Sequence, residues 1–441
     1  RRAWVALAAA QHIAGLVSNE QLADLERHVD DINIERALEI ERETRHDVMA
    51  EIRAFTEQCP VGGGIIHWGA TSADITDNVD VLRQREAAQR LADRLRRLLA
   101  AFARRVEATA DLPIMAHTHI QPAEPTTLGY RLAIYAQDVL EDYRHLSALI
   151  GNLRGKGFKG AVGSQASFVE LLSSTDLTAG QMEMLAMAQL DLPYFPLATQ
   201  TYSRQQDLRV MQVLTSIASS LHKFALDFRI LQSPPFGEWA EPFGKHQVGS
   251  SAMPFKRNPI IAENICSLAR LVAAQAAVAW DNASQAILER SLDDSANRRI
   301  FLPESFLAVD EILRRATSLV DEMVIDREQI GRNLTRYGPF AATERVLMAV
   351  VRAGADRQEA HEWLREASLN AWSALRTGQE NPLVDLLVAD ERLTNYLPAQ
   401  ELRRLMTAGG HVGTAEERAR ALAAEIQAAI RTSSGASPAT N

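Results

Sequence analysis

The chain has 441 residues, of which 46% are hydrophobic and 23% are charged, a composition that excludes wholesale disorder. At roughly 150 residues per domain, this length allows about three domains. The 47 Lys and Arg residues and 56 Asp and Glu residues give a net charge of −9, which argues against a general binder of nucleic acid or anionic membranes. An anionic ligand would therefore have to be held by a local cluster of cations.

The N-terminal part, residues 1–72, predicts short helices and a glycine-rich turn at Gly62–Gly64. Its charged and apolar opening resembles a signal peptide, but Gln11 and His12 interrupt the apolar run, so we interpret it as one side of a helix. The whole chain has only 23 Gly and 16 Pro, which favours long helices over a many-stranded sandwich.

Long amphipathic helices are predicted in the middle of the chain. Apolar side chains recur at three- and four-residue steps in five stretches, which are Leu82–Val106, Leu128–Ile150, Val210–Ile230, Pro259–Ile287 and Phe306–Val324. A helix of about 28 residues is about 40 Å long, so these stretches predict one elongated all-α bundle. We expect three domains: short helices in 1–72, the central bundle in 73–325 and shorter helices in 326–430. Residues 431–441 are rich in Ser, Gly, Ala and Pro and predict a disordered tail.

Two further features bear on the location of the protein. The longest uncharged runs lie between Arg209 and Lys223 and between Arg270 and Asp281, well below the roughly 20 residues that span a bilayer. We therefore expect no contact with a membrane. Cys59 and Cys266 are the only cysteines and cannot make a disulfide framework, which favours a cytoplasmic protein.

The segment before the fourth long helix concentrates reactive groups. Gly249 permits unusual backbone angles, and Asn258-Pro259 is typical of a helix start. The free N–H groups of a helix N-terminus suit a carboxylate or a developing oxyanion, and Lys256 adds formal charge there. The serine pair Ser250-Ser251 beside this cluster could supply an activated hydroxyl. The residues alone leave open a plain Ser-Ser turn followed by a capped helix.

The run Gly-Ser-Ser-Ala-Met-Pro-Phe-Lys-Arg-Asn-Pro at 249–259 is similar to the signature of the fumarase/aspartase superfamily. Within that superfamily the sequence resembles the adenylosuccinate lyases, from Trp4 to about residue 425. Further matching motifs, in order and approximate spacing, lie at residues 45–47, 69–72, 118–123, 200–204 and 292–299. One departure is that the family's N-terminal Arg-Tyr element, which contacts the substrate phosphate, has no counterpart, so part of the phosphate site stays unassigned.

The resemblance implies a reaction and a fold. The fold is the three-domain, all-α fumarase/aspartase type with a central bundle of five long helices. The reaction is β-elimination of fumarate from adenylosuccinate, giving AMP, and from succinylaminoimidazole carboxamide ribotide, giving AICAR. Both substrates are phosphorylated small molecules of purine biosynthesis, and no cofactor is implied.

The resemblance also implies the catalytic residues. Ser250 would be the base; a serine hydroxyl is a poor base at its free pKa and needs strong electrostatic help, for which Lys256 and the nearby helix N-terminus are candidates. His119, in a Pro-flanked loop, would be the acid that protonates the leaving nitrogen. Glu263 would pair with this histidine and raise its pKa. The pair His117 and His119 could be a surface loop or an accidental metal site, but further ligands are lacking, so no metal is expected.

Ten residues match substrate-binding positions of the family: Arg45, His46, Asp47, Thr71, Ser72, Gln200, Asn258, Arg290, Ser295 and Arg299. Arginine suits the anionic ends of the substrate because its fork binds a carboxylate or phosphate through two hydrogen bonds. Without the resemblance, residues 45–47 would be a solvated helix face, residues 293–295 a helix cap and residues 298–299 surface charges. Lys156 and Lys159 are weaker candidates, and we interpret His67 as structural.

The predicted catalytic segments, 45–72, 117–123 and 246–264, lie in different connections between long helices, so we expect that one subunit alone does not unite them. The resemblance implies a homotetramer with a core of 20 helices and active sites shared by three subunits. Two alternatives stay open: another superfamily lyase such as 3-carboxy-cis,cis-muconate cycloisomerase, and a non-catalytic helical scaffold. Residues 45–47 and 292–299 argue against the first, and the complete catalytic set argues against the second.

Overall fold

The structure, a computed structural model, describes residues 1–253 and 255–432 and is built almost entirely of helices. This confirms the predicted all-α class and the helical multi-domain fold. The chain divides into two compact units, of which unit 1 comprises residues 1–92, 144–215 and 271–307, and unit 2 comprises residues 93–143, 216–270 and those from 308 on. The boundaries expected after residues 72 and 325 stay a prediction.

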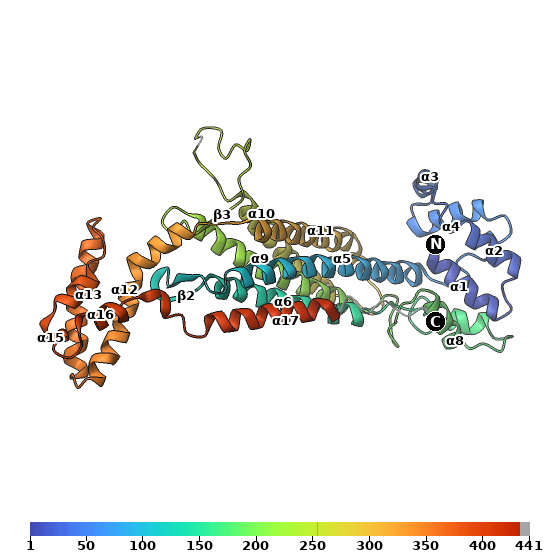
Figure 1. The fold of residues 1–441 in the computed structure, drawn as a ribbon. Coiled ribbons are helices and arrows are strands. Elements are labelled where there is room, and N and C mark those ends of the chain that lie inside the picture. Colours follow the sequence, from blue (N-terminus) through green and yellow to red (C-terminus); the bar gives the residue numbers. More distant parts are fainter. Residues whose placement is uncertain (254, 433–441) are drawn as a thin grey trace. The chain divides into compact units, whose positions relative to one another are not determined.

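Five long helices form the central bundle (Figure 1). They are α5 (Ser72–Ala108), α6 (Leu128–Asn152), α9 (Gln205–Gln232), α10 (Ile260–Ser284) and α11 (Asp293–Glu322), and they confirm the five stretches predicted from apolar periodicity. Within unit 2 their buried faces interlock through aromatic rings: Phe224 of α9 meets Phe102 of α5 and Tyr135 of α6 edge to face, at ring-centre distances of 5.4 and 5.3 Å. Such contacts add about 0.5–1.5 kcal/mol each to the burial of the rings.

Short helices complete unit 1. They are α1 (Arg2–Ile13), α2 (Asn19–Arg27), α3 (Ile34–Thr44), α4 (Asp47–Gln58), the 3-10 turn η1 (Gly63–Ile65), α7 (Ala166–Leu171) and α8 (Ala179–Gln189). Two of these helices begin with a reciprocal capping box, Ser18 with Gln21 for α2 and Thr178 with Gln181 for α8. Local sequence therefore determines where these two helices start.

A β-hairpin replaces the Pro-flanked loop that we expected around His119. Strand β1 (Pro113–Thr118) pairs antiparallel with β2 (Gln121–Thr127), with an irregularity in register between Met115 and His117. A second, very short pair joins β3 (Trp239–Ala240) to β4 (Val324–Ile325). Prolines are tolerated here because a two-stranded ribbon consists only of edge strands, which leave one row of backbone groups unpaired.

The C-terminal helices belong to unit 2, and α12 to α16 share one hydrophobic core. They are α12 (Arg327–Arg352), α13 (Arg357–Arg376), α14 (Leu383–Ala389), α15 (Glu391–Thr394), α16 (Ala399–Leu405), the 3-10 turn η2 (Ala408–Gly410) and α17 (Ala415–Thr432). Buried leucines from three of them, Leu364, Leu387 and Leu402, lie in that core. The tail predicted to be disordered begins within α17, and its residues 433–441 lie outside the described part of the chain.

Helix α10 is the one helix in the described residues that is long and apolar enough to cross a membrane, by length and composition alone. Such a helix is weak evidence of a membrane span because core helices pass the same test. Its residues Ile265 and Val272 are fully buried in the fold, whereas Leu271 and Trp280 are exposed.

Candidate active site

The loop between β3 and α10 carries Ser250 and Lys256 and projects from the helices of unit 2 (Figure 1). Gly249 is required here because a Cβ atom at this position would lie 2.0 Å from the carbonyl oxygen of Lys256. The side-chain amide of Asn258 donates to the Gly249 carbonyl oxygen at 3.4 Å, which ties the two ends of the signature together. The Ser250 hydroxyl oxygen accepts the backbone N–H of Met253 at 3.1 Å, so this oxygen lies in a local serine turn.

The N-terminus of α10 is already occupied by a carboxylate of the same chain. The two oxygens of Glu241 accept the N–H groups of Ile261, at 3.1 Å, and Ala262, at 2.8 Å. The expectation that the first N–H groups of this helix are free for a ligand is therefore wrong for these two. Burial raises the pKa of Glu241, and the two backbone hydrogen bonds oppose that rise.

His119, the expected acid, and Glu263, its expected partner, lie in different elements of unit 2. His119 and Ile120 form the two-residue tip of the hairpin, with φ of +54° and +60°, as a type I′ turn requires. Positive φ is unusual for a β-branched residue such as Ile120, so the tip stores strain. Glu263 is half exposed in the first turn of α10 and faces Arg229 at 3.8 Å. Among the hydrogen bonds and ion pairs of the described chain, none joins His119 to Glu263 or to Ser250.

In unit 1, the structure brings together two of the predicted substrate-binding segments. Arg45 caps the C-terminus of α3 with φ of +52°, and the ring of His46 caps α4 by accepting the N–H of Met49 at 3.3 Å. Asp47, the first residue of α4, accepts a hydrogen bond from Arg299 of α11 at 3.0 Å. All of these side chains are exposed, so they are open to a ligand.

The segment around Arg290 lines a cavity of about 210 Å³ within unit 1. The guanidinium of Arg290 donates to Asp294 at 2.9 Å, and Arg290, Asp294 and Asn297 are among the lining residues. The backbone N–H of Gln200 donates to the carbonyl oxygen of Glu289, which places Gln200 next to this segment. Ser295 is half buried in the first turn of α11.

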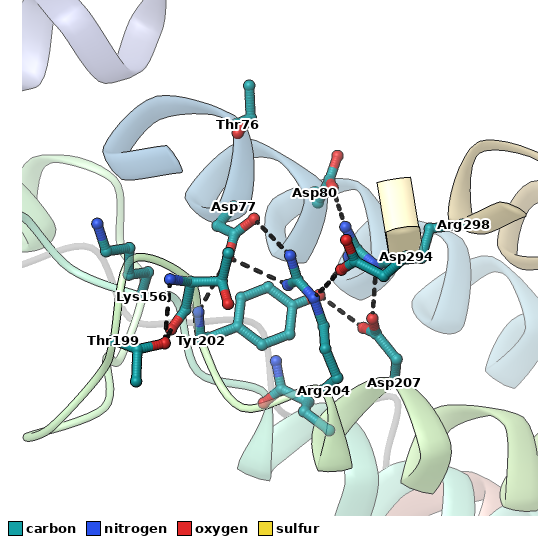
Figure 2. Close-up of polar contacts among 12 residues, drawn as sticks. Thr76, Asp77, Asp80, Lys156, Thr199, Tyr202, Arg204, Asp207, Asp294 and Arg298 are labelled. Atoms are coloured by element: carbon teal, nitrogen blue, oxygen red, sulfur yellow. Dashed lines mark hydrogen bonds and ion pairs between the residues drawn. The ribbon is translucent and has the colours of Figure 1, made fainter. Parts of the chain in front are cut away.

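A buried ionic network beneath these segments was not recognised from the sequence (Figure 2). Arg204 pairs with Asp77 of α5 at 3.1 Å and with Asp294 of α11 at 2.6 Å. Arg298 pairs with Asp207 at 2.7 Å and donates to the hydroxyl of Tyr202, which is fully buried. Burial alone would raise the pKa of the Asp294 carboxyl, but Arg204 and Arg290 hold it below its ordinary value. Burial raises the pKa of Tyr202 well above its ordinary value, so its hydroxyl keeps its proton.

The two lysines that we considered weaker ligand candidates have internal partners. Lys156 is fully buried and pairs at 2.5 Å with Asp74, which is also fully buried. Lys159 is buried and pairs with Glu183. The same Asp74 carboxylate accepts the N–H of Thr71 at 2.9 Å. Asp74 therefore anchors the Thr71-Ser72 segment, and both lysines have a structural role.

His67 has φ of +69° and accepts a hydrogen bond from Trp4, whose indole nitrogen lies 3.0 Å from the Nδ1 atom of His67. An indole N–H can only donate, so Nδ1 carries no proton and the neutral ring is protonated at Nε2. Burial lowers the pKa of His67, and nearby His46 lowers it further while Asp74 opposes the shift. This contact supports the structural interpretation of His67.

No group of three His, Cys, Asp or Glu side chains in residues 1–253 and 255–432 is placed to hold a metal ion.

The predicted site residues divide between the two units. Ser250, Lys256, Asn258, His119 and Glu263 belong to unit 2, whereas the other predicted substrate-binding residues belong to unit 1.

Comparison with known families covers most of the chain. Residues 1–274 match the lyase family, and residues 339–422 match the family described as the adenylosuccinate lyase C-terminus. Adenylosuccinate lyase of Saccharomyces cerevisiae is 38% identical over 398 residues, which are 89% of this chain and 82% of that protein. The protein of the same name from Archaeoglobus fulgidus is 34% identical over 95% of this chain and 90% of its own length.

Solved structures with the same fold include a fumarate lyase from Mesorhizobium, with a TM-score of 0.83, 23% identity, and coverage of 96% of this chain and 93% of that one. The 3-carboxy-cis,cis-muconate lactonizing enzyme of Pseudomonas putida has a TM-score of 0.84 at 24% identity, covering 97% and 93% of the two chains. At such identities the likeness shows the fold alone. The sequence likeness goes further, and the chain belongs to the adenylosuccinate lyase family of lyases.

Proposed function

We propose that the chain is a C–N lyase that eliminates fumarate from adenylosuccinate, giving AMP, and from succinylaminoimidazole carboxamide ribotide, giving AICAR. The observation that carries this proposal is the contact between Asp47 and Arg299, 3.0 Å apart in unit 1. It joins the Arg45–Asp47 and Ser295–Arg299 segments, both of which the family resemblance matches to substrate-binding positions. Arg45 and Arg299 are both exposed, and an arginine fork suits a phosphate better than a neutral group.

The proposed chemistry has three tasks. Ser250, as the alkoxide, takes a proton from the carbon that neighbours the nitrogen-bearing carbon. The electron pair of that C–H bond moves into the carboxylate attached to the same carbon. Lys256 stabilises the doubly charged aci-carboxylate that forms; losing one such preorganised donor typically costs about 3–4 kcal/mol of barrier. The electron pair then returns to form the double bond of fumarate while the C–N bond breaks, and His119 gives a proton to the leaving nitrogen. Glu263 holds the histidine in its productive tautomer.

We further propose a homotetramer whose active sites combine residues of several subunits. His119 lies at an exposed hairpin tip, and Glu263 faces Arg229 instead of a histidine. We therefore propose that another copy of the chain supplies the partner of His119 and the partner of Glu263. The exposed apolar side chains of α10, among them Leu271 and Trp280, support contact with a further helix.

The protein would act in the cytoplasm, on a phosphorylated small molecule. Cys59 and Cys266 are both buried as free thiols, which supports a reducing compartment.

Spectrophotometry tests the activity: the purified protein should release fumarate from adenylosuccinate, and no release would contradict the proposal. Mixing tests the shared site. Ser250→Ala and His119→Gln proteins should each be inactive, and a mixture refolded or exchanged together should regain activity, because some sites then receive both intact residues. A mixture that stays inactive, although native mass spectrometry shows mixed tetramers, would place both residues in one subunit.

A further inference from the structure

We propose that Glu241 and Gln232 are positioning residues that close the base of the loop carrying Ser250 and Lys256. The proposal rests on the function proposed above only in that this loop supplies the base. Both residues belong to unit 2, and Glu241 follows β3 directly, at the point where the loop begins.

Glu241 connects the beginning of the loop to the helix that follows it. Its carboxylate is 8% exposed and accepts the N–H groups of Ile261 and Ala262, at 3.1 and 2.8 Å. These are orphan donors of the first turn of α10, which no backbone carbonyl of the helix can satisfy. A negative charge at this end is also attracted by the positive end of the helix dipole, which stabilises the cap. The loop therefore starts and ends on one buried hydrogen-bonded cap.

Gln232 makes the second connection across the base. Its side-chain oxygen accepts the backbone N–H of Glu241 at 2.8 Å, and its side-chain nitrogen donates to the carbonyl oxygen of Arg257 at 3.1 Å. One side chain at the end of α9 thus joins the first residue of the loop to one of its last. The guanidinium of Arg257 in turn lies over the ring of Phe243, 4.7 Å from its centre.

The loop itself holds few other connections to the fold. Among the described residues of the loop, Gly249 is linked to Asn258, and the bonds of Ser250 lie within its own turn. The position of Ser250 and Lys256 relative to α10 is consequently set at the base, by Glu241 and Gln232. A displacement of about 1 Å at a reacting group can reduce the rate about 100-fold, so these contacts bear on turnover.

The test compares Glu241→Gln and Gln232→Met with Asp326→Asn in the full-length protein. Glutamine keeps the size of Glu241 but loses its charge, and methionine keeps the length of Gln232 but makes no bridge. Asp326 is the matched control because its carboxylate caps another helix of unit 2, α12, by accepting the N–H of Gln329. Hydrogen exchange measured by mass spectrometry follows residues 255–270, and fumarate release from adenylosuccinate gives kcat and KM.

In Glu241→Gln we expect exchange in the first turn of α10 to become about tenfold faster. The kcat should fall about 10- to 100-fold with KM changed less than about threefold, because the arginines proposed to bind the substrate lie in unit 1, outside this loop. Gln232→Met should show the same pattern, whereas Asp326→Asn should loosen α12 alone.

Unchanged exchange in the first turn of α10, or a kcat within about twofold of the wild type in both variants, would overturn the proposal. If the wild-type protein releases no fumarate, the proposed function fails, and the exchange measurement still decides whether Glu241 and Gln232 hold the loop.

Discussion

Arg298 and Arg299 are neighbours on α11, yet they have opposite environments: the side chain of Arg298 is 8% exposed and that of Arg299 is 69% exposed. Arg298 is held by Asp207 inside unit 1, and Arg299 reaches Asp47 at the surface of the same unit. Successive residues of a helix point about 100° apart, so one arginine can stabilise the fold while the next is available to a ligand.

Replacing Arg299 should therefore impair substrate binding. We expect Arg299→Gln to raise the KM for adenylosuccinate about 10- to 100-fold, because a charge-assisted pair of hydrogen bonds to the phosphate is lost. Steady-state assays give the KM, and Arg332→Gln, which alters an exposed surface arginine, is the control. The substrate without its phosphate should show a much smaller difference between variant and wild type. An equal loss with both substrates would mean that Arg299 does not bind the phosphate.

Replacing Arg298 should instead lower the free energy of unfolding. Arg298→Gln leaves Asp207 buried with no compensating charge, and breaking a buried ion pair in this way typically costs about 3–5 kcal/mol. We expect a clear fall of the thermal midpoint in calorimetry, while the KM of the folded fraction changes little. A variant as stable as the wild type would show that water or Tyr202 compensates the charge.

How far the sequence could predict the fold depended on how local its signals are. The long helices were predictable because their apolar stripes repeat over 20 or more residues within each element. The hairpin β1–β2 was not, because its prolines are typical of loops, and its strand pairing forms only between Pro113–Thr118 and Gln121–Thr127. Its type I′ tip at His119-Ile120 lacks the glycine or asparagine that marks such turns.

The ionic network beneath the site shows the other limit. Asp294, Arg298, Phe301 and Ser305 form one buried stripe on α11 at helical spacing. Extending the apolar stripe of this helix toward its N-terminus would have marked Arg298 as buried and Arg299 as exposed. Its partners could not be found in this way, because Asp77 and Asp207 lie on other helices and only the tertiary fold brings them to Arg204 and Arg298.

Ser250 provides a direct test of the proposed base. We expect Ser250→Ala to lower kcat at least about 100-fold, because no other group can take the proton from the substrate. Ser251→Ala, one residue further along the same loop, is the matched control and should keep most of the activity. Stopped assays with substrate well above KM give both values. A Ser250→Ala protein within about threefold of the wild type would remove Ser250 from the base role.

Trp4 should set the protonation of His67. The folded protein holds the pKa of His67 below its ordinary value of 6.5, through burial and the nearby His46, so the unfolded chain binds a proton more readily. The free energy of unfolding therefore loses the contribution of His67 as the pH falls below 6.5, and is unaffected by it above that value.

Trp4→Phe removes the N–H donor and frees Nδ1, so it should raise the pKa of His67. Carbon NMR of labelled histidine, assigned with His67→Gln, measures this pKa. Trp239→Phe is the control, because the Trp239 indole is equally buried but bonds to no histidine in the described chain. An unchanged pKa in Trp4→Phe would mean that burial alone, and not the indole N–H, keeps His67 neutral.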